Sequence, residues 1–298
     1  MKIAVVGGSG FIGSHLVEGL LKEGHIVRVI DKEKPFQNKV KHDCVDILNY
    51  PLLEKSLNDV EVIYHLAAHK DANAGANQPL NFFQTNVNGT LNVLEAARKQ
   101  AIKRVIFASS VWVYSAASGE RVSEETPLEI LKANHPYTLS KILSEAYIRK
   151  YHELFGLDYT ILRYGVTYGA RAKLHGLVPL FIQKAIKNEP VVIFGNGKQK
   201  RSLIYVRDIA AGNIAALQDA AKNKTYNIDG NKSVSVNQFL EVLEKVIGKK
   251  INVNYQQARQ DDYPGKQVDI EKARKELHWM PETGLEEGIK KYLHSLSS

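Results

Sequence analysis

The chain has 298 residues, of which 44% are hydrophobic and 24% are charged, a balance that is typical of globular proteins and excludes long disordered stretches. A single cysteine, Cys44, excludes an internal disulfide and fits a reducing compartment. The formal net charge is +8, but the basic residues are scattered along the chain, so we predict no nucleic-acid partner. No run approaches the roughly 20 apolar residues of a membrane-spanning helix. We therefore expect a soluble cytoplasmic protein without a membrane partner.

Predicted strands and helices alternate through the first two thirds of the chain. The strands are short apolar runs rich in Val and Ile, as expected for strands buried on both faces, at residues 3–6, 26–30, 60–64, 104–107 and 159–162, with a weaker one at 42–45. The helices predicted between them span residues 11–22, 80–99 and 136–155. This alternation predicts an α/β protein with a Rossmann-type doubly wound parallel sheet.

The pattern changes after about residue 162, where glycine and proline become frequent. The later predicted elements are helices at 177–187, 236–247, 270–277 and 285–296 and strands at 191–193, 226–228 and 251–255. We therefore predict an NAD-binding Rossmann domain over residues 1–170, with a return to its sheet at 204–228. A smaller mixed α/β substrate-binding lobe is predicted over 171–298.

Three glycines lie between the first predicted strand and the first predicted helix. Gly7 allows a tight turn, Gly10 allows the backbone to approach a pyrophosphate, and Gly13 allows the helix to pack on the strand. The helix N-terminus then presents free N–H groups and a positive dipole to the phosphates. The predicted cofactor contacts of this loop are Gly7, Gly10, Phe11, Ile12 and Gly13.

An acidic residue, Asp31, ends the second predicted strand about 20 residues beyond the glycine loop. Its carboxylate can accept hydrogen bonds from the adenosine ribose hydroxyls and would repel the additional phosphate of NADP. NAD is therefore the predicted cofactor. The neighbouring Lys32 and Lys34 could accommodate that phosphate, so NADP remains an alternative.

Tyr137 and Lys141 are four residues apart near the start of a predicted helix, which places them on one helix face. An ammonium group near a phenol favours the phenolate and lowers the phenol pKa, so Tyr137 is a candidate general base. Ser110 follows the strand predicted at 104–107, at the sheet edge where open parallel sheets bind ligands. The predicted catalytic residues are Ser110, Tyr137 and Lys141.

Further motifs extend over nearly the whole chain. They are Asp46-Ile47, His65-Leu66-Ala67-Ala68, Asn86-Val87-Asn88-Gly89-Thr90, Ser109-Ser110 before Val113-Tyr114, Leu162-Arg163-Tyr164, and Arg201 before Ile204-Tyr205-Val206-Arg207-Asp208. With these motifs the chain resembles the extended short-chain dehydrogenases/reductases, specifically their NAD-dependent nucleotide-sugar epimerase/dehydratase group.

The resemblance implies roles for individual residues. Tyr137 would be the base, Lys141 would hold the nicotinamide ribose, and Ser110 would assist at the sugar hydroxyl. The implied cofactor contacts are Asp46 and Ile47 at the adenine, Leu66, Ala67 and Ala68 along the centre, and Tyr164 near the nicotinamide. Arg201 and Arg259 would grip the diphosphate of a nucleotide-sugar substrate. A homodimer formed through helices 80–99 and 136–155 is also implied.

The residues after Ser110 indicate which reaction of this group to expect. Its dehydratases usually carry an Asp-Glu pair there and its decarboxylases a nearby Glu, whereas this chain has Val111-Trp112, which cannot transfer protons. We therefore predict an NAD-dependent epimerase that oxidises C4 of a UDP- or dTDP-hexose to a keto-sugar and returns the hydride. The alternatives are an NAD(P)-dependent sugar-nucleotide dehydrogenase, ketoreductase or dehydratase, and a non-catalytic NAD-sensing regulatory protein.

Other residues depart from the group's pattern and do not identify the substrate. Relative to the group's usual pattern, Ser115 replaces Gly, Val166 replaces Asn, Ala170 replaces Pro, and Ser202-Leu203 replaces Asp-Phe. Trp112 could stack on a sugar or pack internally, and Lys70 and Asp71 could line the mouth of the site or be solvated. His65 and His69 have no cysteine or carboxylate set to complete a zinc site, so no metal is predicted.

Overall fold

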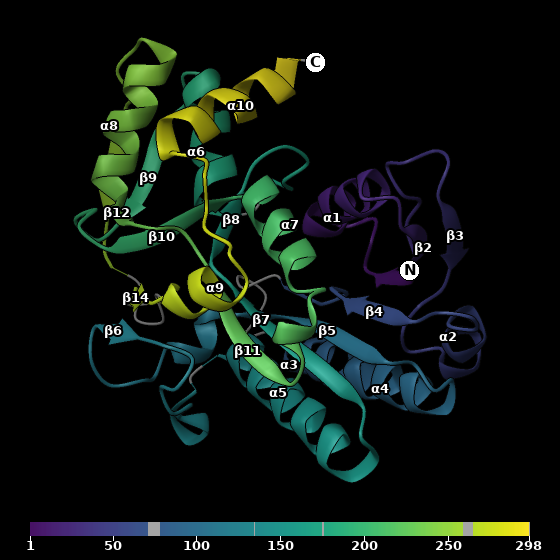
Figure 1. Ribbon diagram of the computed structural model, residues 1–298. Coiled ribbons are helices and arrows are strands. Elements are labelled where there is room, and N and C mark those ends of the chain that lie inside the picture. The colour runs from purple at the N-terminus through teal and green to yellow at the C-terminus, as the bar shows by residue number, and fades with distance from the viewer. Residues whose placement is uncertain (71–77, 134, 175, 259–264, 298) are drawn as a thin grey trace.

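A seven-stranded parallel sheet lies at the centre of the molecule (Figure 1). The structure is a computed structural model and describes residues 1–70, 78–133, 135–174, 176–258 and 265–297. The strand order is β11-β7-β5-β4-β1-β2-β3, and all neighbouring strands are parallel. The strands are β1 (Lys2–Val6), β2 (Ile26–Asp31), β3 (Lys41–Cys44), β4 (Val62–His65), β5 (Arg104–Ser110), β7 (Asp158–Tyr164) and β11 (Lys224–Ile228). The predicted doubly wound parallel sheet is confirmed.

Helices cover both faces of this sheet because alternate side chains of each strand point to opposite faces. In β1, Ile3 and Val5 join one buried cluster and Ala4 and Val6 join the other. The first cluster is covered by α1 (Phe11–Lys22), α7 (Val206–Ala215) and α9 (Glu271–Glu276). The second is covered by α2 (Tyr50–Ser56), α4 (Gly89–Lys99) and α5 (Pro136–Phe155).

The helix predicted over residues 80–99 is divided into three segments. They are α3 (Pro79–Phe82), the π-helical segment η2 (Phe83–Asn88) and α4. A π-helical turn holds an additional residue, so it changes which side chains face inward. It brings Asn86 inward, where its Oδ1 accepts from the N–H of His69 at 2.7 Å and its Nδ2 donates to Ser140 Oγ at 2.9 Å. The segment after β4 is thereby tied to α5.

The chain leaves the main sheet after β7 and later returns to it. β8 (Val166–Tyr168), β10 (Lys200–Tyr205) and β12 (Ser233–Ser235) form a separate three-stranded sheet. Immediately after β10, α7 packs against α1, and β11 then adds the edge strand beside β7. The strand predicted at 226–228 is therefore an edge strand of the main sheet.

A second core lies in the C-terminal part of the chain. It includes buried Tyr168, Phe181, Phe239 and Tyr292. The elements around it are α6 (Leu177–Ile186), β9 (Val191–Phe194), α8 (Val236–Ile247), β13 (Val253–Gln256) and α10 (Leu285–Ser297). The short remaining elements are η3 (Val111–Tyr114), β6 (Arg121–Val122), η4 (Ile130–Lys132), η5 (Asp219–Ala221) and β14 (Gln267–Val268).

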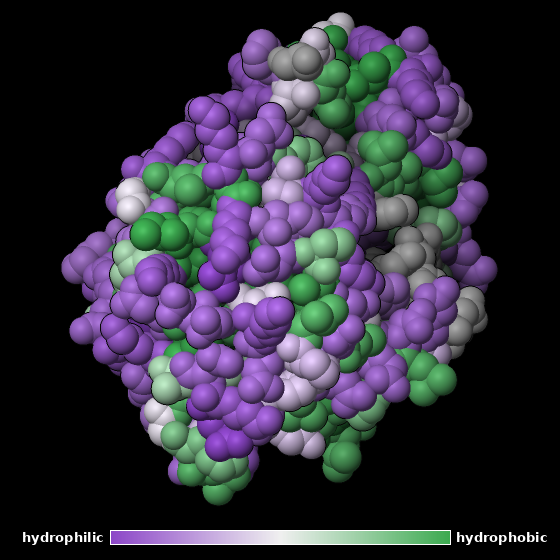
Figure 2. Space-filling model, turned by 90° about the vertical axis from the view of Figure 1, so that its right-hand side faces the viewer, coloured by the Kyte–Doolittle hydropathy of each residue, from purple (hydrophilic) through white to green (hydrophobic). Residues whose placement is uncertain are grey.

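Polar side chains dominate the face that Figure 2 shows. Hydrophilic residues cover most of it, with smaller hydrophobic patches between them. This is the surface expected where charged helix side chains contact water. Among the described residues, no helix combines the length and apolar character needed to cross a membrane.

Candidate active site

The glycine loop between β1 and α1 has no room for a side chain at Gly7 or Gly13 and little room at Gly10. Gly7 has a φ of +87°, and a Cβ there would lie 2.4 Å from the backbone nitrogen of Ala67. A Cβ on Gly13 would lie 2.2 Å from the carbonyl oxygen of Gly7, and one on Gly10 would lie 3.2 Å from it. The tight turn and the close packing of helix on strand thus both depend on glycine.

The N-terminus of α1 has the features of an anion site. Its N-cap is Gly10, and within the described residues no side-chain hydrogen bond caps it and no acidic residue lies in its first turn. The N–H groups of Phe11 and Ile12 and the positive end of the helix dipole therefore remain for a phosphate. Lys70 adds a cation nearby, with its Nζ 5.6 Å from the centre of the Phe11 ring.

Asp31 is held in place at the end of β2. Its Oδ2 accepts from the N–H of Ser9 at 3.0 Å, and its Oδ1 accepts from the N–H of Glu33 at 3.1 Å. Each carboxylate oxygen retains acceptor capacity for a ribose hydroxyl. Lys32 pairs with Asp46 at 3.2 Å instead of with Asp31, but its side chain is largely exposed, so this ion pair is weak.

Of the segments predicted to line the rest of the cofactor, residues 66–67 lie beside the glycine loop. The N–H groups of Leu66 and Ala67 both donate to the carbonyl oxygen of Val6, at 2.8 and 2.9 Å. Ile47 is buried, and its carbonyl oxygen accepts from Asn92 Nδ2 at 2.9 Å. The first two contacts hold the chain after β4 against the carboxyl end of β1, and the last joins the chain after β3 to α4.

Tyr137, Lys141 and Ser110 come together where α5 crosses the carboxyl end of β5. The Lys141 ammonium is buried, donates to the carbonyl oxygen of Ala108 at 2.6 Å, and lies 5.9 Å from the centre of the Tyr137 ring. Ser110 is the last residue of β5, and its side chain hydrogen-bonds with Tyr137. Two hydroxyls and one buried amine thus meet at the ligand-binding edge of the sheet.

Burial dominates the acid–base properties of this group. It raises the pKa of Tyr137 to about 12, opposed by the hydrogen bond with Ser110. Burial also lowers the pKa of Lys141 to about 7, opposed by the nearby carboxylate of Glu145. The structure differs here from the expectation that Lys141 lowers the pKa of Tyr137, because removing the phenolate from water is the larger effect.

Aromatic side chains surround Tyr137. The rings of Trp112 and Phe82 lie edge-on to it, with centroids at 6.4 and 6.3 Å. His135 precedes α5, accepts from the N–H of Tyr137 at 3.0 Å, and lies 6.0 Å from Trp112. Trp112 therefore packs against the predicted base, and with these rings around it Tyr137 is only partly exposed.

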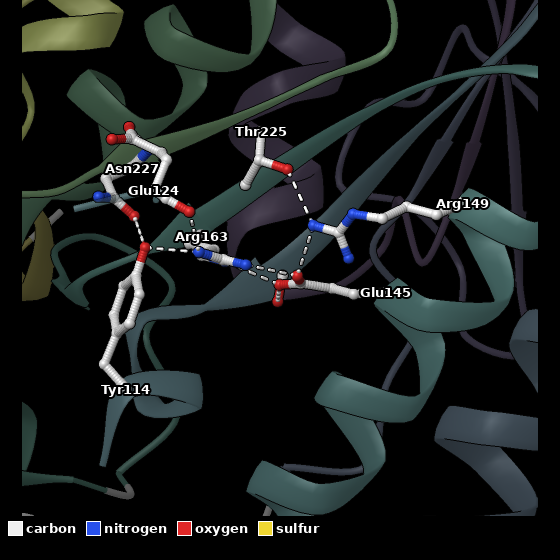
Figure 3. A network of polar contacts seen from close by, with 8 residues as sticks. Tyr114, Glu124, Glu145, Arg149, Arg163, Thr225 and Asn227 are labelled. Carbon is white, nitrogen blue, oxygen red and sulfur yellow. Dashed lines mark hydrogen bonds and ion pairs between the residues drawn. The ribbon is translucent and has the colours of Figure 1, made fainter. Parts of the chain in front are cut away.

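A buried polar network beneath this group was not predicted from the sequence. Figure 3 shows Glu145 reaching from α5 to Arg163 of β7, whose guanidinium lies between Glu145 and Tyr114. Arg163 donates to Glu145 at 2.9 and 2.7 Å and to the Tyr114 hydroxyl at 2.6 Å. The available sequence signal was a charge, Glu145, that repeats the spacing of four from Tyr137 through Lys141.

Residues predicted at the substrate end are less closely assembled. Arg201 lies half-buried on β10, and its Nη1 donates to the carbonyl oxygen of Lys200 at 2.8 Å. The hydroxyl of Tyr164 donates to Asn213 Oδ1 at 2.5 Å within the first buried cluster, so a cofactor contact by Tyr164 falls to its main chain or ring. Arg259 and Asp71 lie outside the described residues.

The two histidines considered for zinc are in separate environments. His65 is buried, its Nε2 is 2.9 Å from Thr90 Oγ1, and burial lowers its pKa to about 3. The His69 ring lies 4.7 Å from that of Phe82. In the part of the chain that the structure describes, no three His, Cys, Asp or Glu residues are grouped to hold a metal ion.

Comparisons with known proteins agree on one family. The sequence profile of the NAD dependent epimerase/dehydratase family matches residues 3–229. A putative UDP-glucose 4-epimerase of Methanocaldococcus jannaschii is 37% identical, over 98% of this chain and 97% of that protein. The solved UDP-glucose 4-epimerase of Thermotoga maritima, in complex with UDP-glucose, has a TM-score of 0.94 and 29% identity, covering 100% of this chain and 99% of its own. A UDP-glucuronic acid 4-epimerase from Bacillus cereus, solved with UDP-glucuronic acid and NAD, has a TM-score of 0.92 and 29% identity, covering the same shares.

Proposed function

The chain belongs to the NAD dependent epimerase/dehydratase family, and we propose that it is an NAD-dependent epimerase that inverts C4 of a UDP-hexose. The observation that carries this proposal is the meeting of Ser110, Tyr137 and Lys141 at the edge of the sheet. The positions after Ser110 hold Val111 and Trp112, which have no transferable proton. The site therefore supports oxidation and reduction of one hydroxyl rather than elimination of water.

The residues of the chain divide the proton chemistry between them. Tyr137 takes the proton of the C4 hydroxyl, and Ser110 holds that hydroxyl by a hydrogen bond. Lys141 would hold the nicotinamide ribose and would stabilise the phenolate of Tyr137. NAD, when bound, supplies the acceptor for the C4 hydride and a positively charged nicotinamide, which favours the phenolate. When the keto-sugar turns before the hydride returns, Tyr137 gives the proton back and C4 is inverted.

We assign the cofactor to the carboxyl edge of the main sheet. The glycine loop and the N-terminus of α1 would hold the pyrophosphate, and Asp31 would hold the adenosine ribose. The cramped glycine positions and the open N–H groups of α1 fit a dinucleotide. The other proposed contacts are Asp46, Ile47, Leu66, Ala67 and Ala68, with Lys70 added from the structure.

The sugar nucleotide would lie between this edge and the C-terminal lobe. Arg201 on β10 is the proposed contact for its diphosphate, since guanidinium groups bind phosphate oxygens with charge-assisted hydrogen bonds. In this proposal residues 1–170, with the return at 204–228, bind NAD, and residues 171–298 bind the substrate.

A second copy of the chain would cover the outer surface of α3, η2 and α5. Leu80 and Phe83 on this surface are 72% and 47% exposed, and Leu139 and Tyr147 of α5 are 37% and 42% exposed. A hollow of about 310 Å³ lined largely by apolar side chains, including Phe82, Phe83 and Leu139, lies between these helices. Apolar area of this kind favours a homodimer.

The test is to incubate the purified protein with UDP-glucose, UDP-galactose and the two C4 epimers of UDP-glucuronic acid and to follow C4 by NMR. We expect interconversion of one pair without net NADH formation. Tyr137→Phe should lower kcat by about 10²–10⁴-fold, the usual contribution of general acid–base catalysis. Tyr255→Phe on β13 removes an exposed phenol outside the proposed active site and the proposed dimer surface, and it serves as the matched control.

Other outcomes would identify the alternatives. Net NADH formation would indicate a dehydrogenase. Binding of NAD without turnover of any sugar nucleotide would favour the NAD-sensing protein. Unchanged turnover in Tyr137→Phe would show that the assigned base is wrong.

A further inference from the structure

Glu145 continues the row of side chains formed by Tyr137 and Lys141. The three residues are spaced by four along α5 and therefore lie on one side of that helix. The Glu145 side chain has no exposed surface. Its Oε1 accepts from Ser109 Oγ at 2.6 Å and from Arg163 Nε at 2.9 Å, and its Oε2 accepts from Arg163 Nη2 at 2.7 Å (Figure 3). Arg149, which is partly exposed, adds a contact to Oε2 at 3.1 Å.

A buried ion pair such as Glu145–Arg163 is weak evidence for a role in stability alone. Removing a carboxylate and a guanidinium from water costs several kcal/mol per ion, and well-packed apolar residues of similar volume are often at least as stable. The Glu145–Arg163 pair therefore points to a requirement other than packing. Its position, one helical turn from Lys141, suggests that this requirement concerns the active site.

The network joins α5 to three neighbouring strands of the main sheet. Ser109 directly precedes Ser110 on β5, and Arg163 lies on β7. Arg163 also donates to the hydroxyl of Tyr114, which donates in turn to Asn227 Oδ1 of β11 at 2.8 Å. One carboxylate thus connects the helix that carries Tyr137 and Lys141 to the strand that carries Ser110.

We propose that Glu145 is a positioning residue of the active site, which sets Ser110 through Ser109 and supports the charge of Lys141 from one helical turn away. The inference rests on the proposed function, because it assigns Ser110, Tyr137 and Lys141 their roles. Glu145 itself would not contact the substrate or the cofactor.

The charge of Glu145 acts on a buried amine. Burial lowers the pKa of Lys141, and the carboxylate of Glu145 is the opposing influence that raises it. The charged or titratable groups around the two residues are His65 on β4, Tyr137 and Arg149 on α5, Arg163 on β7 and Tyr114 on η3. His65 is neutral at physiological pH, and Arg163 is already paired with Glu145. Removing the carboxylate would therefore let Lys141 lose its proton at lower pH.

The experiment compares kcat and KM across pH for the wild type and Glu145→Gln, with folding checked by circular dichroism and thermal unfolding. We expect kcat at neutral pH to fall by about tenfold, since small misplacements of reacting groups have effects of this size or larger. KM for the sugar nucleotide should change little. The alkaline limb of the plot of kcat against pH should shift to lower pH by about one unit. Glu153→Gln is the matched control, because Glu153 lies on the same helix but is exposed.

A second variant distinguishes the effect of Glu145 on the position of Ser110 from the effect of its charge on Lys141. Ser109→Ala removes the hydrogen bond between Ser109 and Glu145 but leaves the Glu145–Arg163 pair intact. We therefore expect kcat to fall by about fivefold or more without a shift of the alkaline limb of the pH profile. If Glu145→Gln does not fold, this variant decides the question. A folded Glu145→Gln with the wild-type pH profile, or Ser109→Ala with the wild-type kcat, overturns the proposal. Failure of the proposed function would be distinct, because the wild type would then not epimerise any of the sugars.

Discussion

The carboxyl edge of the main sheet and the C-terminal lobe differ in how the fold specifies their functional groups. At the sheet edge, residues 7 and 13 have to be glycine, because an added Cβ would lie less than 2.5 Å from backbone atoms. Lys141 at this edge is buried and hydrogen-bonded. In the lobe, the proposed substrate contact Arg201 is a long, half-exposed side chain on a six-residue strand. The proposed cofactor region is therefore constrained by close backbone packing, whereas the side chain of the proposed substrate contact Arg201 is only partly buried. Two of the departures from the family pattern, Val166 and Ser202, lie on β8 and β10 of the three-stranded sheet, and β10 also carries Arg201.

The largest effect that this comparison predicts is at the glycine loop. In Gly13→Ala the new methyl group would lie 2.2 Å from the Gly7 carbonyl oxygen, so backbone must move. We expect NAD affinity to fall by about 10³-fold, since the helix N-terminus loses its alignment, and the free energy of unfolding to fall by about 1–3 kcal/mol. Calorimetric titration with NAD and thermal unfolding would measure both. In the control, Gly284→Ala, the methyl group enters open space. Wild-type NAD affinity in Gly13→Ala would show that the dinucleotide does not bind at this loop.

A smaller effect is expected where the two regions meet, at Asp229. Its side chain is fully buried, Oδ1 accepts from the N–H of Gly230 at 2.7 Å, and burial raises its pKa from 3.8 to about 7. The folded protein thus holds this proton more tightly than the unfolded chain does. The stability contributed by the protonated form is complete below about pH 4 and is lost as the pH rises through 7.

The Asp229→Asn variant has no carboxyl group to deprotonate at this position, so it does not lose stability in this way as the pH rises. Its stability relative to the wild type should therefore rise from pH 4 to pH 8 by about 2 kcal/mol, roughly half of what a three-unit shift corresponds to at 1.36 kcal/mol per unit. Urea unfolding at several pH values would measure the difference. A constant difference between the two proteins across this range would contradict the assignment of Asp229 as the titrating group.

The smallest effect is expected in the lobe itself. Arg201→Gln should raise KM for the sugar nucleotide by about tenfold, because a hydrogen bond to a charged group contributes about 1.5–3 kcal/mol, and should leave kcat within about twofold. Lys200→Gln, an exposed neighbour on the same strand, is the matched control. Steady-state kinetics would show the result, and equal KM values for both variants would place the diphosphate elsewhere.

Much of the fold could be predicted because the pattern of apolar residues is strong where strands are buried on both faces. α1, α5 and α8 have the predicted bounds, and the five strong strands of the first part all join the main sheet. α7 was not predicted, because it packs on α1 so closely that Gly19 faces Ile214, and its buried sides leave little amphipathic periodicity. The π-helical turn at Phe83–Asn88 was missed because sequence periodicity assumes 3.6 residues per turn.

The arrangement predicted for the candidate site matches the structure where it depends on local spacing. The glycine loop precedes a helix, and Tyr137 and Lys141 share a helix face. The Glu145–Arg163 pair could not be predicted, since a charge in a sequence is normally assigned to the surface and its partner lies 18 residues away on a different element. The raised pKa of Tyr137 likewise depends on burial, which requires the three-dimensional structure.

The return of the chain through α7 and β11 also determines how the protein can be divided. Because β11 closes the edge beside β7 and α7 covers α1, a fragment ending at residue 170 would leave an unpaired strand edge and an uncovered helix. Exposed edges of this kind invite aggregation. Lobe exchange between relatives therefore has to retain α7, β11 and also α9, which covers the same face of the sheet, so the chain has to be cut around each of these returning segments instead of once.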